Sequence, residues 1–118
     1  MPRTIKLILA LLTLALLAGC AQQEVFTDRV AQVQLAVKGK QLQYIVLKLE
    51  KHPRVDFMIS VQDANTFKLT EKRVTPRTNQ QELYRELSKL RGQTVELKGY
   101  TRTSTRFIVR AFKKVDGK

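Results

Sequence analysis

Hydrophobic and polar residues alternate in five segments of the chain, and this period of two predicts β-strands with one buried face. The five segments are residues 30–38, 41–50, 54–62, 94–100 and 105–113. Turn-forming residues bound them, such as Gly39-Lys40 after the first segment and residues 63–65 after the third. Pro53 cannot donate a hydrogen bond to a sheet, so we expect residues 51–53 to break the second strand. The pattern therefore predicts a mainly β domain.

One segment shows helical spacing instead. Its apolar positions recur every three or four residues and are Leu83, Leu87 and Leu90, with Tyr84 beside them. Thr78 or Asn79 is suited to cap the start of this helix, and Gly92 suits the position just past its end. The preceding stretch, residues 66–77, is mixed and basic, and its pattern allows a short strand at residues 67–69.

The first nineteen residues have the pattern of a targeting segment. Arg3 and Lys6 form a short basic head, and an apolar run follows to Leu17. A membrane-spanning helix needs roughly 20 apolar residues, whereas this run of about 11 to 13 has the length of a signal peptide. We therefore expect the segment to direct export and not to remain as a transmembrane anchor.

The motif Leu17-Ala18-Gly19-Cys20 closes that run. It resembles the lipobox of bacterial lipoproteins. The resemblance implies that the thiol of Cys20 receives a diacylglycerol, that the chain is cut just before it, and that the new amine is acylated, with palmitate-type chains as the anchor. Ala21 follows the cysteine where an Asp would favour the inner membrane, so the resemblance points to the outer membrane. The competing interpretation is an apolar helix that ends in a buried free cysteine.

These patterns divide the chain into four parts. Residues 1–19 are the expected lipoprotein signal peptide, residues 20–29 the lipidated cysteine and a polar tether, residues 30–115 the folded domain and residues 116–118 a tail. A tether of nine residues spans at most about 30 Å. The domain would therefore stay close to the lipid surface.

The order strand, strand, strand, helix, strand, strand is that of an OB-fold, a five-stranded Greek-key barrel. Residues 87–100, LSKLRGQTVELKGY, resemble the helix-to-fourth-strand passage of OB-fold proteins, in which L-x-G-x-x-V-x-V-x-G recurs. The chain looks most like small exported OB-folds, including lipoproteins of the tRNA-anticodon-like type. The resemblance implies a small OB-like barrel (β-β-β-α-β-β) whose helix closes the barrel bottom. Gly99 fits a bend or a close backbone contact. The alternative is a two-layer α+β sandwich, a meander with one helix packed across it.

The composition and the absence of known motifs exclude several kinds of functional site. The chain has 118 residues, enough for one domain, with a single Cys and a single His. A Cys/His-rich zinc site and an internal disulfide are excluded, and no nucleophile elbow or phosphate-binding glycine loop occurs. His52 is expected to be a solvated turn residue. We therefore expect a protein that is not an enzyme and carries no metal or cofactor.

Basic residues outnumber acidic residues by more than two to one. Lys and Arg number 22 against 10 Asp and Glu, and removal of residues 1–19 with Arg3 and Lys6 would leave a net charge of +10. On and around the last two strands we single out a candidate ligand-binding set: Lys98, Tyr100, Arg102, Arg106 and Arg110. Basic fields attract anionic lipid, nucleic acid and other polyanions. Stacking aromatics for single strands would be Tyr44, Tyr100 and Phe112.

These features predict a lipid-anchored, non-catalytic binding or structural module of the bacterial cell envelope, on the periplasmic face of the outer membrane. Its expected partners are membrane lipid through Cys20 and an envelope protein. The alternative function is binding of a periplasmic polyanion or single-stranded nucleic acid. The loops that flank an OB-fold's nucleic-acid site, here residues 39–40 and 101–104, are short, and this weakens the alternative.

Overall fold

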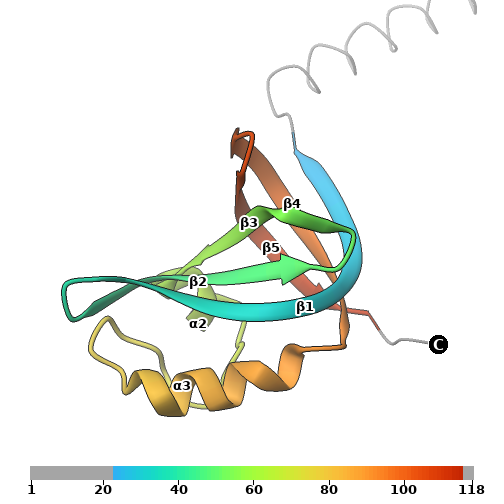
Figure 1. Cartoon of the computed structure of the whole chain (residues 1–118). Coiled ribbons are helices and arrows are strands. Elements are labelled where there is room, and N and C mark those ends of the chain that lie inside the picture. The colour runs from blue at the N-terminus through green and yellow to red at the C-terminus, as the bar shows by residue number, and fades with distance from the viewer. Residues whose placement is uncertain (1–22, 116–118) are drawn as a thin grey trace, which may run out of the picture.

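The computed structural model describes residues 23–115. Its elements, in chain order, are β1 Glu24–Lys38, β2 Gln41–Leu49, β3 His52–Ser60, α2 Val61–Thr66, α3 Gln80–Leu87, the short 3-10 helix η1 Ser88–Leu90, β4 Thr94–Thr103 and β5 Arg106–Lys114 (Figure 1). The expected signal peptide, Cys20 and the tail at residues 116–118 lie outside the described residues. The prediction of a mainly β domain is confirmed.

The strands form one sheet that closes on itself in a ring, in the order β1-β2-β3-β5-β4, with β4 pairing back onto β1. Neighbouring strands are antiparallel except β3 and β5, which run parallel with Phe57 opposite Phe107. A meander contains no parallel pair, because each strand simply returns beside the one before it. The alternative architecture of a meander crossed by one helix is therefore excluded.

Strand β1 begins at Glu24, six residues earlier than predicted. The expected tether at residues 20–29 is therefore wrong for residues 24–29, which pair with β4 from Glu24 opposite Gly99 onward. The remainder of β1 pairs with β2, and a register shift just after Val30 marks the bend between the two partners. One long strand thus belongs to both sides of the ring, as the curved blue ribbon in Figure 1 shows.

Asp28 explains why the alternation failed to reveal this part of β1. Its carboxylate lies on the buried face, where the pattern calls for an apolar side chain. The oxygen Oδ1 accepts a hydrogen bond from the N–H of Arg29 at 2.7 Å, and Oδ2 accepts from the N–H of Lys51 at 2.7 Å. A buried carboxylate is tolerated where donors satisfy it. Asp28 thereby fastens the turn between β2 and β3 to β1.

That turn consists of Glu50 and Lys51, so β3 starts at His52 and includes Pro53. The break is where it was predicted to within two residues, but Pro53 lies inside the strand. The pairing of β2 with β3 is irregular between Leu47 and Leu49, and proline is tolerated at such a bulge because no ladder hydrogen bond is lost.

The third strand ends at Ser60, two residues before its predicted end, and leads directly into α2. Ser60 caps this helix, since its Oγ accepts a hydrogen bond from the N–H of Asp63 at 3.1 Å. The predicted turn at residues 63–65 is therefore helical, and the suggested strand at residues 67–69 does not form. The element order gains a helix, β-β-β-α-α-β-β, and the predicted order β-β-β-α-β-β is corrected accordingly.

The cap and the buried face of helix α3 are those predicted from the sequence. Asn79 is its N-cap, and its side-chain oxygen accepts hydrogen bonds from the N–H groups of residues 81 and 82. The predicted stripe is buried over α3 and η1, and Gly92 adopts a positive φ of 84° just past the end. Tyr84 is the exception, because it faces solvent.

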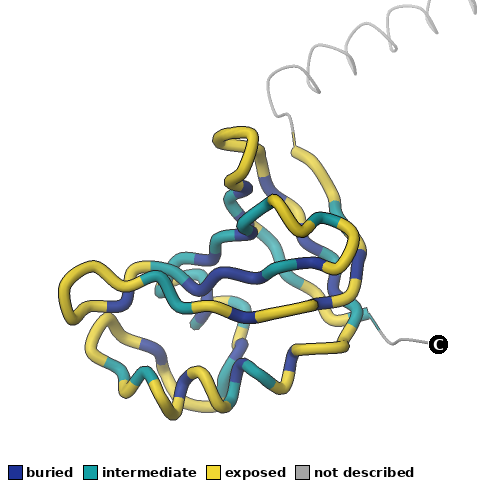
Figure 2. The backbone as a smooth tube through the Cα atoms, viewed as in Figure 1, coloured by how far each residue is buried: buried dark blue, intermediate teal, exposed yellow. Residues whose placement is uncertain are grey.

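The core fills the ring and the space between the ring and the helices. Its fully buried large side chains come from every strand and from α3: Phe57, Phe107, Leu42, Ile45, Leu47, Leu49, Ile59, Leu87, Leu97, Val30 and Val33, with Val74 from the loop before α3. Figure 2 shows exposed residues on the turns, along much of β1 and on α3. The last hairpin is longer than predicted, since β4 reaches Thr103 and its turn is Ser104–Thr105 instead of residues 101–104.

Candidate binding surfaces

The five residues predicted to bind a ligand are all exposed, and they fall into two groups. Lys98, Tyr100 and Arg110 lie on the outer face of the β4–β5 pair. Arg102 and Arg106 lie at the tip of the hairpin, where Thr103 pairs with Arg106. The structure therefore brings the predicted set onto one hairpin, but spreads it from the middle of the strands to the tip.

Tyr100 begins an apolar row across the outer face of the sheet. It lies opposite Ile108 of β5, which lies opposite Met58 of β3, which in turn lies opposite Val46 of β2. Exposure falls along this row, from 48% for Tyr100 to 5% for Val46. An ion pair between Lys48 and Asp56 flanks its buried end. The accessible apolar surface is thus at the β4 end, beside Lys98 and the hairpin tip.

A bulge in β5 changes the role of Phe112. Lys98 lies opposite Ala111 whereas the next residue, Gly99, lies opposite Val109, so Arg110 is the extra residue. The bulge shifts the alternation, and Phe112 turns toward the core, where its ring stacks on Phe67 with centroids 6.1 Å apart. The prediction that Phe112 offers a stacking platform is therefore wrong. Tyr44 is half-buried, which leaves Tyr100 as the exposed member of the predicted aromatic set.

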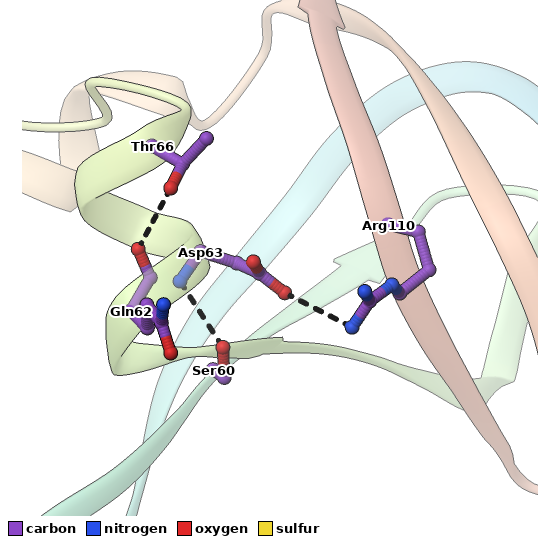
Figure 3. Close-up of polar contacts among 5 residues, drawn as sticks. All are labelled: Ser60, Gln62, Asp63, Thr66 and Arg110. Carbon is purple, nitrogen blue, oxygen red and sulfur yellow. Dashed lines mark hydrogen bonds and ion pairs between the residues drawn. The ribbon is translucent and has the colours of Figure 1, made fainter.

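Two of the five residues predicted to bind a ligand, Lys98 and Arg110, form ion pairs with acidic side chains. Arg110 Nη1 lies 3.8 Å from Oδ2 of Asp63, which stands in the first turn of α2 beside its cap Ser60 (Figure 3). Lys98 Nζ lies 3.6 Å from Oε1 of Glu96. Exposed pairs of this kind contribute at most about 1 kcal/mol to stability, but they neutralise local charge.

The two tip arginines are different. Within residues 23–115, no carboxylate lies at ion-pair distance from Arg102 or Arg106. Their guanidinium groups therefore present uncompensated positive charge at the end of the hairpin, where every residue from 101 to 106 is exposed. An anion can use both the charge and the hydrogen-bond donors of such groups.

A second basic feature, which the sequence patterns did not single out, lies at the helical end of the domain. It is an open groove of about 600 Å³ between the loop before α3 and the end of α3. Five basic residues line it against two acidic ones: Lys68, Lys72, Arg73, Lys89 and Lys114 against Glu71 and Glu86. The basic composition of residues 66–77 was the sequence signal for it, but the loop conformation that brings the walls together is not periodic and could not be predicted.

Asn65 and Val74 hold that loop in place. The side-chain amide of Asn65 donates to the carbonyl of Val74 at 2.7 Å, and its oxygen accepts from the N–H of Val74 at 2.6 Å. Lys68 adopts a positive φ of 55°, and Leu69 and Val74 anchor the loop in the core. The groove is therefore built on a fixed loop.

His52 is half-buried, contrary to the expectation of a solvated turn residue. Its imidazole ring meets Phe26 edge to face, with centroids 4.9 Å apart, and its centroid lies 6.4 Å from that of the Phe57 ring. His52 thus packs against aromatic side chains at one end of the closed sheet. No group of three or more His, Cys, Asp or Glu side chains suited to a metal ion occurs in the described residues. Within residues 23–115, none of the helices combines the length and hydrophobicity needed to cross a membrane.

Comparison with protein-family models, with curated protein sequences and with solved structures gave no match to this chain.

Proposed function

We propose that the chain is a bacterial lipoprotein whose signal peptide, residues 1–19, is removed and whose Cys20 carries the lipid anchor. The observation that carries this proposal is the motif Leu17-Ala18-Gly19-Cys20 directly after a basic head and a short apolar run. The mature protein would lie at the periplasmic face of the outer membrane. There it would act as a non-catalytic binding or structural module with an envelope protein as partner.

The proposed domain is an OB-like barrel that contains one helix, α2, in addition to the single helix of the order β-β-β-α-β-β. The ring order β1-β2-β3-β5-β4 and the position of α3 between β3 and β4 support this interpretation. The close approach of Gly99 to the neighbouring strand supports it too, because the glycine of the motif falls at that contact. A rigid small barrel on a lipid anchor is suited to hold a fixed surface near the membrane.

Metabolic labelling with a radioactive fatty acid tests the anchor. The wild-type chain should be labelled and should begin at residue 20, whereas Cys20→Ala should be unlabelled and should retain residues 1–19. Ala21→Asp is a matched control, which should stay labelled and move toward the inner membrane. Label that persists on Cys20→Ala would refute the lipidation site.

The uncompensated charge of Arg102 and Arg106 favours one alternative, binding of a periplasmic polyanion or single-stranded nucleic acid. An oligonucleotide of single-stranded DNA, titrated by fluorescence anisotropy, should then bind with an affinity that falls steeply with salt. Arg106→Ala and Arg110→Ala should weaken that binding, and Lys40→Ala at the β1–β2 turn should not. Absence of binding at ~50 mM salt would end this alternative.

A further inference from the structure

The start of β1 and the tip of the last hairpin lie at the same end of the ring. Glu24 pairs with Gly99, and the hydroxyl of Thr101 donates to Oε1 of Glu24 at 2.8 Å. From Gly99, β4 continues to Thr103 before the turn at residues 104–105. In Figure 1 this hairpin rises beside the described beginning of β1, and in Figure 2 its tip is exposed throughout.

The length of chain before β1 limits where a lipid on Cys20 can be. Cys20 stands four positions before Glu24, and these four steps span at most about 14 Å. Thr103 stands four positions beyond Gly99, the partner of Glu24, and this stretch of strand covers about 13 Å. Cys20 can therefore extend beyond the sheet about as far as the hairpin tip does, and no farther. A bilayer that holds Cys20 must come close to that tip.

The chemistry at this end fits a surface of anionic phospholipid. Arg102 and Arg106 have no acidic partner among the described residues, and guanidinium groups bind phosphate oxygens with two hydrogen bonds. Tyr100 is 48% exposed behind them, and Val25 of β1, which lies opposite Lys98, is 55% exposed. Tyrosine is enriched where apolar lipid meets the headgroups. Basic, aromatic and aliphatic groups thus combine on the side that the tether brings to the membrane.

We propose that the hairpin tip, residues 101–106, with Tyr100 and Val25 behind it, docks on the anionic phospholipid headgroups of the bilayer that holds Cys20. This inference rests on the proposed lipid anchor and adds an orientation to it. The β1–β2 turn at Gly39-Lys40, at the other end of the fifteen-residue strand β1, then points away from the bilayer. The helical groove also stays free, because its walls come from the loop before α3, from the end of α3 and from Lys114, which ends β5 away from the hairpin tip.

Site-specific fluorescence quenching tests the orientation. The acylated product of the Ser104→Cys variant, which begins at Cys20, is labelled at the thiol of position 104 and reconstituted in vesicles that contain phosphatidylglycerol and a headgroup-linked quencher. Lys40→Cys, labelled in the same way, is the matched control. The probe at position 104 should be quenched strongly and the probe at position 40 weakly. Equal quenching at both positions, or stronger quenching at position 40, would overturn the docking.

Charge dependence provides the second readout. In the Ser104→Cys background, Arg102→Gln with Arg106→Gln should weaken the docked state by about fivefold for each arginine lost, because a basic residue near an anionic surface contributes about 1 kcal/mol and this energy corresponds to about a fivefold change. Lys38→Gln with Lys40→Gln removes the same charge at the far turn and should leave the quenching unchanged. Quenching that is the same in phosphatidylcholine vesicles and in phosphatidylglycerol vesicles would overturn the role of the arginines.

The failure of the anchor and the failure of the docking give different results. The proposed lipidation transfers a diacylglyceryl group from a phospholipid to the sulfur of Cys20: a C–S bond forms, the phospholipid's glyceryl C–O bond to phosphate breaks, and the phosphate headgroup leaves while the thiol loses its proton. The sulfur is then a thioether, so the wild-type product should not react with a maleimide. A reactive Cys20 would refute the anchor on which the inference rests. An unreactive, acylated Cys20 together with a probe at position 104 that is not quenched would refute the docking alone.

Discussion

Gly99 of β4 lies against the backbone carbonyl of Ile108 in β5, so closely that a Cβ atom at position 99 would lie 1.8 Å from the Ile108 oxygen. The obstructing atom belongs to the main chain of the neighbouring strand, which cannot move without breaking the pairing. We expect Gly99→Ala to lower the free energy of unfolding by about 3 kcal/mol. Urea denaturation followed by circular dichroism measures this loss as a lower midpoint.

Gly39 provides the control for that substitution. It has a positive φ of 65° at the β1–β2 turn, and a Cβ atom there would meet nothing within 4 Å. Asparagine tolerates this conformation, so Gly39→Asn should change the free energy of unfolding by less than about 1 kcal/mol. If both variants lose the same stability, the contact with Ile108 is not the cause.

Substitution of the buried Asp28 tests whether its hydrogen bonds stabilise the closed sheet. Its carboxylate accepts the N–H of Arg29 and the N–H of Lys51, and therefore joins β1 to the turn between β2 and β3. Asp28→Ala leaves both donors without this acceptor, and the expected loss is about 2 kcal/mol. Asp28→Asn keeps one side-chain oxygen and should lose less. An alanine variant as stable as the wild type in urea would contradict this role.

The regular parts of the fold could be predicted from the sequence because one physical rule governs each. Alternation marked β2 and the centres of the other strands, and leucine spacing with an asparagine cap marked α3. The predicted close contact at Gly99 is confirmed. The misses have local causes: Asp28 places a charge on a buried face, and Ser60 starts a helix while the alternation continues through Val61.

The binding surfaces were predictable only in part. Charge along β4 and β5 identified exposed residues, but the bulge at Arg110 cannot be read from a period of two, and it turned Phe112 inward. The pairing of Arg110 with Asp63 depends on α2, which the patterns did not reveal. The helical groove depends on hydrogen bonds between Asn65 and Val74. Such features arise from tertiary contacts that leave no periodic trace.

Asp63 offers a separate test of the polyanion alternative. Its carboxylate lies 3.8 Å from the guanidinium of Arg110 and neutralises part of the outer face. Because the contact is long and the Arg110 side chain is exposed to solvent, Asp63→Asn should change the free energy of unfolding by less than about 1 kcal/mol. If the face binds oligonucleotides, the variant should bind them more tightly, by up to about fivefold at low salt. Unchanged or weaker binding, in a protein of unchanged stability, would contradict a role for Arg110.

The loop that lines the helical groove is held by Asn65, so loss of this side chain should open the loop without unfolding the whole domain. Asn65→Ala removes both side-chain hydrogen bonds to Val74, and the expected local loss is about 2 kcal/mol. Trypsin should then cleave faster after Lys72 and Arg73, which line the groove on that loop. Mass spectrometry of the first fragments locates the cut.

Asn79→Ala separates the loop from the helix. It removes the cap of α3, at a cost of about 1 kcal/mol, but leaves the contact between Asn65 and Val74 intact. Early cleavage after residues 72 and 73 should therefore rise much less than in Asn65→Ala when the two variants are compared at equal distance below their unfolding midpoints. Equal acceleration at these sites would mean that the loop opens only with the global unfolding of the domain, and that Asn65 does not hold the groove in place by itself.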